Sequence, residues 1–172
     1  MLSGAVLARA GWRGVGGVAV AMCLAGLPSH AVAAPCGDTA DLLPAPYDAL
    51  VRGESALDAG RAQEAIAELN AAATVLAGPA ARRRLLLLGR AQLPTDPKAA
   101  AASLRAALAD VDAPGHRASP CDADPAELRW WLAEASPIDA RPTLWRAIWT
   151  NNPTSARSDD AEARLALDPS FA

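Results

Sequence analysis

The chain has 172 residues with 19 acidic and 16 basic side chains, so its formal net charge is −3. If the first 33 residues are removed, 14 basic residues remain against 19 acidic ones, a net charge of −5. This acidic balance argues against nucleic acid or an anionic membrane surface as the main partner. Abundant Ala and Arg, with few β-branched and aromatic residues, favour helices in a single domain.

Residues 1–33 have the pattern of a cleavable secretion signal. Arg9 and Arg13 precede an apolar stretch at 15–27, and Ala31 and Ala33 give the small-x-small pattern that signal peptidase requires. These 13 apolar residues are too few for a membrane span, which needs about 20. We therefore expect cleavage after Ala33, a periplasmic or secreted bacterial protein, and no transmembrane segment after cleavage.

Two cysteines remain after cleavage, Cys36 and Cys121. In an oxidising compartment an even pair indicates a disulfide first, and both residues lie in segments rich in Pro, Asp and Gly. We expect a Cys36–Cys121 bridge, with two free thiols as the alternative. A single His and the lack of paired ligand spacing argue against zinc.

An irregular leader at 34–45 precedes a helical domain at 46–168 and a short tail at 169–172. Asp96-Pro97 and Asp124-Pro125 are each typical of an N-cap followed by Pro in the first turn, and Glu127 lies at the capping-box position. The four leucines at 85–88 surround the helix axis, which indicates burial on both sides. Gly78-Pro79 and Ser136-Pro137 are each expected to stop a helix. Together with apolar spacing of three and four residues, these signals predict an all-α fold of about seven helices, at 46–57, 62–76, 80–93, 97–111, 125–135, 140–150 and from 155 or 158 to 167.

Small residues recur at fixed spacing in the first four predicted helices. Gly53 lies seven residues before Gly60, Ala65 and Ala72 follow, and a second copy begins at Gly89, 36 residues after Gly53. Small side chains at these positions allow two helix backbones to approach closely. The pattern resembles the tetratricopeptide repeat, and a looser third copy covers 128–135 and 144–153. The resemblance implies a solenoid of antiparallel helix pairs.

Residues 147–155 and the acidic helix after them are similar to the N-terminal helical superhelix of bacterial soluble lytic murein transglycosylases. Those enzymes carry a catalytic Glu in a Glu-Ser motif, with a Gly-Leu-Met-Gln segment downstream. Here Glu54-Ser55 is the only Glu-Ser pair, and no Gly-Leu-Met-Gln segment follows it. We interpret Glu54 as a solvated helix residue, so this resemblance implies the superhelix without its catalytic domain.

The other catalytic candidates are better interpreted as structural residues. His116 has no Gly-x-Ser-x-Gly nucleophile motif to accompany it, which argues against a triad. The pairs Asp122/Asp124 and Asp159/Asp160 are interpreted as exposed acids at helix starts, where the dipole favours negative charge, rather than as a glycosidase pair. After cleavage no Gly-rich phosphate loop remains. We therefore predict no catalytic site, no cofactor and no metal.

The four tryptophans of the expected mature chain lie between 130 and 149. Trp145 and Trp149 are four residues apart, which predicts that both enter the core. The three arginines at 82–84 are interpreted as a solvated helix start. The tetratricopeptide resemblance implies a concave groove that binds peptides, or glycans by stacking, with an ordinary solvated face as the alternative; its expected lining residues are Tyr47, Glu54, Arg83, Arg90, Trp130 and Glu134.

Together these patterns predict an exported, non-catalytic helical-repeat scaffold that binds protein or peptidoglycan in the bacterial cell envelope. The alternative is a truncated superhelical part of a lytic transglycosylase.

Overall fold

A computed structural model describes residues 45–117, 119 and 122–168, all of which belong to one compact unit. The predicted secretion signal, the leader up to residue 44, Cys36, Cys121 and the tail at 169–172 lie outside the described residues. Export and the disulfide therefore stay predictions.

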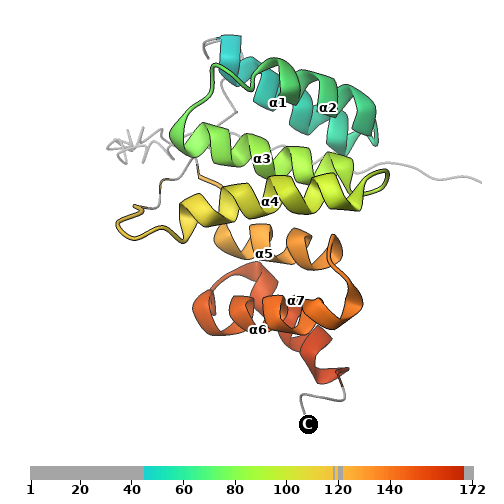
Figure 1. Ribbon diagram of the computed structural model, residues 1–172, viewed down its shortest axis with the longest axis vertical. Helices are drawn as coiled ribbons and strands as arrows, with labels where there is room; N and C mark the ends of the chain where they lie inside the picture. Colours follow the sequence, from blue (N-terminus) through green and yellow to red (C-terminus); the bar gives the residue numbers. More distant parts are fainter. Residues whose placement is uncertain (1–44, 118, 120–121, 169–172) are drawn as a thin grey trace, which may run out of the picture. The chain divides into compact units, whose positions relative to one another are not determined.

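The described residues form helices and no strand, which confirms the all-α prediction. Figure 1 shows the helices stacked in chain order, with α1 and α2 at the top and α6 and α7 at the bottom. Their bounds are α1 Ala45–Asp58, α2 Ala62–Ala71, α3 Gly78–Gln92, α4 Pro97–Val111, α5 Pro125–Glu134, the 3-10 turn η2 Ile138–Ala140, α6 Arg141–Asn151 and α7 Ala156–Ala166.

Most predicted helix bounds agree with the structure to within two residues, but α2 ends five residues before the predicted end at Leu76. After Ala71 the backbone tightens into turns in which Ala73 N–H donates to the Asn70 carbonyl and Val75 N–H to the Ala72 carbonyl. Gly78 and Pro79, expected to stop a helix, instead begin α3. Proline suits the first turn of a helix, where its missing N–H costs nothing.

Side-chain caps fix the starts of three helices. Asp96 accepts a hydrogen bond from the Ala99 amide at 2.9 Å, as the sequence predicts, and Asp124 accepts one from the Ala126 amide at 2.9 Å. Ser155 caps α7. Glu127 does not close a capping box; its carboxylate instead binds the side chains of Trp131 and Arg157.

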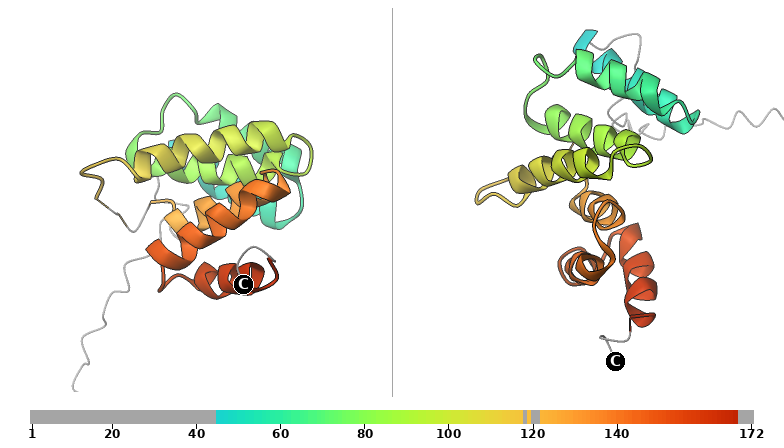
Figure 2. Two further views of the ribbon diagram at one scale, coloured as in Figure 1. Left: turned by 60° about the horizontal axis from the view of Figure 1, so that its bottom comes forward. Right: turned by 45° about the vertical axis from the view of Figure 1, so that its right-hand side comes forward.

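Successive helices pack against each other from α1 to α7, and a second set of contacts joins α1 to α3, α3 to α5, and α5 to α7. The odd-numbered helices therefore form a continuous row. Figure 2 shows α7 beside α5 and α6 from two further directions. None of the helices in the described part of the chain is long and apolar enough to cross a membrane.

Helix α3 belongs to two apolar clusters at once. Leu87 and Leu88 pack with residues of α1 and α2, whereas Leu85 and Leu86 pack against a cluster built by α4 and α5. The prediction that this leucine run is buried on both sides is confirmed.

Two glycines mark the close approach of paired helices. A Cβ atom added at Gly53 would lie 2.8 Å from Leu69 Cγ, and one at Gly89 would lie 2.5 Å from Leu104 Cγ. Both separations are far inside normal carbon–carbon contact. The expected role of these small residues is therefore confirmed at both positions, 36 residues apart.

The two tryptophans of α6 differ in their surroundings. Trp145 is buried in a cluster with Ile148, as predicted, but Trp149 is 41 % exposed, so its predicted place in the core is wrong. Successive helix residues are rotated by about 100°, and the fully buried Ile148 directs its neighbour Trp149 away from the core.

Candidate functional site

A cavity of about 400 Å³ lies along the row of odd-numbered helices. Each of the four helices in that row contributes at least one side chain, and the segment before α5 adds two carboxylates. The lining residues are Glu54 of α1, Arg83, Leu86, Leu87 and Arg90 of α3, Asp122 and Asp124, Glu127 and Trp131 of α5, and Arg157 of α7.

Three of the six residues expected in the groove line this cavity: Glu54, Arg83 and Arg90. Arg83 Nη2 donates to both oxygens of Glu54, at 2.8 and 3.1 Å, which joins α3 to α1. Glu54 is therefore an ion-paired side chain at the cavity wall, and with 35 % of its side chain exposed it stays partly solvated.

The other three expected residues lie elsewhere. Trp130 is only 8 % exposed and packs in the core with Trp145, and Trp131 takes the place at the cavity that we assigned to Trp130. Glu134, at the end of α5, lies 3.9 Å from Arg141. Tyr47, near the start of α1, is exposed and is not among the residues that line the cavity.

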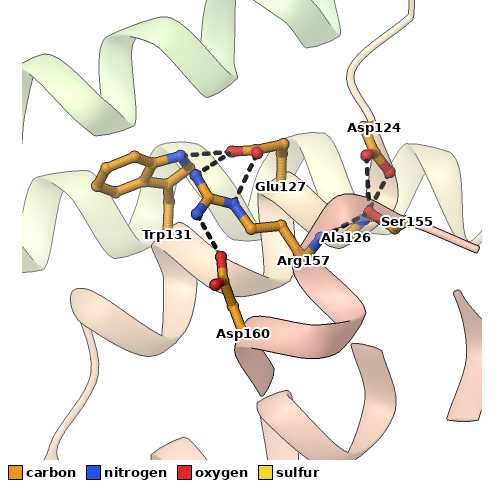
Figure 3. Close-up of polar contacts among 7 residues, drawn as sticks. All are labelled: Asp124, Ala126, Glu127, Trp131, Ser155, Arg157 and Asp160. Carbon is orange, nitrogen blue, oxygen red and sulfur yellow. Dashed lines mark hydrogen bonds and ion pairs between the residues drawn. The ribbon is translucent and has the colours of Figure 1, made fainter. Parts of the chain in front are cut away.

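A network of polar contacts holds Trp131 in place (Figure 3). Its indole Nε1 donates to Glu127 Oε2 at 2.8 Å, and the other oxygen of Glu127 accepts a hydrogen bond of 2.7 Å from Arg157 Nε. Arg157 Nη1 also donates to Asp160 at 2.9 Å. Burial lowers the pKa of Arg157, but the bonds from Glu127 and Asp160 outweigh it and raise the pKa overall.

Arg90 also contacts Trp131, with its guanidinium carbon 5.2 Å from the centre of the ring. This separation is typical of a cation–π interaction. The Arg157 guanidinium lies 5.8 Å from the same ring. Residues of α3, α5 and α7 thus meet at one indole, although they are far apart in the sequence.

A buried ion pair ties the segment before α5 to the start of α3. Arg82 donates to both oxygens of Asp122, at 2.6 and 2.7 Å, and His116 Nε2 lies 3.2 Å from the same carboxylate. The side chains of Arg82 and Asp122 are only 11 % and 5 % exposed. The hydrogen bond from Arg82 is the main cause of a lowered pKa of Asp122, and the same bond raises the pKa of Arg82.

These contacts correct two sequence interpretations. Arg82 and Arg84 are not a solvated helix start, because Arg82 is ion-paired and burial lowers the pKa of Arg84. Asp122 is not an exposed acid, whereas Asp124 is a helix cap as expected. The sequence offered no signal for the Arg82–Asp122 pair, because its members are 40 residues apart and Asp122 lies outside any periodic segment.

A second cavity, of about 570 Å³, lies beside this ion pair and is lined by His116, Asp122, Arg129 and Asn152, among others. Arg129 is buried and donates to Asp112 at 2.6 Å and to Asn152 at 3.2 Å, so it joins α5 to the ends of α4 and α6. Within the described ranges, no three His, Cys, Asp or Glu side chains are grouped so that they could hold a metal ion.

Comparisons of the chain with protein-family models, with curated proteins and with solved structures find no match. The function is therefore argued from the geometry of the site and from the sequence patterns.

Proposed function

We propose that the chain is an exported, non-catalytic helical-repeat scaffold that binds a protein partner or peptidoglycan in the bacterial cell envelope. The observation that carries this proposal is the cavity to which α1, α3, α5 and α7 all contribute side chains. A surface assembled from several successive helices suits a ligand that extends across them. The secretion pattern at 1–33 supports the location in the envelope.

The helix packing supports a tetratricopeptide-like solenoid. Gly53 faces Leu69 of the next helix, and Gly89 faces Leu104 of the next helix in the same manner. The contacts that join each odd-numbered helix to the next one are those expected when helix pairs stack in one direction.

The state of the carboxylates supports a binding role over catalysis. A glycosidase acid needs an environment that keeps its carboxyl group protonated near neutral pH. Here Glu54 is paired with Arg83, Glu127 with Arg157, and Asp122 with Arg82, which lowers the pKa of Asp122. In these pairs the carboxylates serve to hold the helices together.

The alternative is that the chain is the superhelical part of a lytic transglycosylase whose chemistry lies on another domain. The similarity of residues 147–155 to that family favours this alternative. In both cases the row of odd-numbered helices is the binding surface.

Two binding assays test the proposal. The purified chain is sedimented with murein sacculi, and separately it is screened against a displayed library of random peptides. Trp131→Ala should abolish whichever binding is found, whereas Trp149→Ala, which changes an exposed indole outside the cavity, should not.

The absence of binding to both ligands, or binding that survives Trp131→Ala, would contradict the proposal. Release of soluble murein fragments by the chain would contradict the non-catalytic role. If that release survived Glu54→Gln, the active site would have to lie away from the only Glu-Ser pair.

A further inference from the structure

The guanidinium of Arg90 differs from the other cations that line the cavity. Arg83 is 2.8 Å from Glu54, and Arg157 is 2.7 Å from Glu127. Within the part of the chain that the structure describes, Arg90 has no carboxylate within ion-pair distance and contacts the ring of Trp131. A partly buried guanidinium attracts an anion more strongly than one in bulk water, because the local dielectric is lower.

The position of Arg90 is defined by the helices around it. Arg83 and Arg90 are seven residues apart on α3 and line the same cavity, so they lie on one face of that helix. Trp131, on which Arg90 rests, is held by the hydrogen bond from its Nε1 to Glu127. Binding of a ligand group at Arg90 therefore costs little conformational entropy, because these side chains are already ordered.

The surroundings of Arg90 favour a peptide over a glycan. The guanidinium groups of Arg90 and Arg157 lie 5.2 and 5.8 Å from the ring centre of Trp131, so a sugar that stacked on this indole would compete with two cations for it. Leu86 is partly exposed, lines the same cavity and lies one helical turn before Arg90, so it offers apolar surface near the cation. A carboxylate next to an apolar side chain matches this combination.

We propose that Arg90 and Trp131 are the recognition element of the binding face, and that they bind an acidic side chain of an extended segment in a protein partner. This inference deepens the proposed function and rests on it. The carboxylate accepts hydrogen bonds from the Arg90 fork, which is suited to planar anions, and an adjacent apolar residue packs against Leu86.

The test selects peptides from a random displayed library on three immobilised proteins: the unaltered chain, Arg90→Gln and Arg105→Gln. Arg105 is exposed on α4 and lies outside the cavity, so its substitution removes the same charge at a position away from the proposed recognition element. Far-UV circular dichroism and thermal unfolding confirm that each variant is folded. Each selected peptide is then synthesised with its Asp or Glu, and again with Asn or Gln in that position.

We expect the unaltered chain and Arg105→Gln to select peptides rich in Asp and Glu next to an apolar residue, and Arg90→Gln to lose this preference. The acidic peptide should bind the unaltered chain about tenfold more tightly than its counterpart with Asn or Gln in that position, as expected for one charge-assisted hydrogen bond. The two should bind Arg90→Gln equally.

The role of Arg90 would be overturned if the selected peptides were not enriched in Asp and Glu. It would also be overturned if Arg90→Gln still bound the acidic peptide more tightly than its amide counterpart. Either result would leave the peptide-binding scaffold intact. Sedimentation with murein that depends on Arg90, without peptide selection, would overturn the protein partner. If the unaltered chain bound neither peptides nor murein, the proposed function itself would fall.

Discussion

Replacing Gly89 with Ala should destabilise the protein although Ala is the better helix former. In a helix interior the change from Gly to Ala is favourable by about 1 kcal/mol. Here the new methyl group would lie 2.5 Å from Leu104 Cγ and 2.9 Å from its Cδ2, and Leu104 is fully buried. Overpacking of this kind costs up to about 3 kcal/mol, so we expect a net loss of about 2 kcal/mol.

The assay is urea unfolding followed by far-UV circular dichroism, with a matched control and a double-mutant cycle. Ala102 is exposed in the middle of α4, and Ala102→Gly there should cost about 1 kcal/mol, the intrinsic difference between the two residues. Leu104→Ala alone should cost about 2–5 kcal/mol. Combined with Gly89→Ala, it should cost less than the sum, because the smaller side chain relieves the overlap.

The reasoning would be refuted if Gly89→Ala raised the free energy of unfolding. It would also fail if the two substitutions were additive, because Gly89 and Leu104 would then not limit how closely α3 and α4 approach.

Three further predictions concern polar contacts. Asp122→Asn should cost about 3 kcal/mol at neutral pH, because it leaves Arg82 buried without its anion. The bond from Arg82 lowers the pKa of Asp122 in the folded chain, so this contribution is full above the unfolded value near 3.9 and is lost as the pH falls through the folded pKa. Urea unfolding of both chains from pH 7 to pH 2 should show the difference shrinking only in acid. Asp96→Ala removes the cap of α4 and should cost about 1 kcal/mol in the same assay; no change would mean that the cap bond does not form in solution. Arg157→Met should cost about 1 kcal/mol, because its bonds to Glu127 are partly exposed, and it should alter the near-ultraviolet dichroism of the tryptophans; an unchanged spectrum would contradict the network around the indole.

Helix positions were predictable where local signals agree. Asp96-Pro97 and Asp124-Pro125 begin helices because a cap and a fixed proline φ act within a few residues of each other. The end of α2 was not predictable, since apolar spacing continues to Leu76, which is buried without being helical. Burial gives the same sequence pattern in a turn as in a helix.

The candidate site was predictable only in part. Arg83 and Arg90 were expected at the site from the groove that the tetratricopeptide resemblance implies, but the resemblance does not decide between Trp130 and Trp131, because either could fill the core. The environment decides: Trp130 packs with Trp145 of α6, whereas Trp131 finds a hydrogen-bond acceptor in Glu127. Contacts between distant helices carry no signal in local periodicity.

The leucine run at 85–88 has a consequence for the uniqueness of the fold. Side chains that surround a helix supply apolar contacts on every side, so they stabilise α3 at more than one rotation about its own axis. Leucine packing alone would hold α3 between its neighbouring helices, but it would not select a single rotation of α3 about its axis.

The three arginines at 82–84 add to the orientation that Gly89 imposes by facing Leu104, because each arginine has a different partner. Arg82 meets Asp122, Arg83 meets Glu54 of α1, and Arg84 donates to the Leu69 carbonyl of α2 at 3.5 Å. A rotation of α3 by one residue would break all three contacts while leaving leucines against both clusters. The second turn of α3 thus selects one rotation of the helix about its axis, and that rotation determines which of its side chains line the cavity.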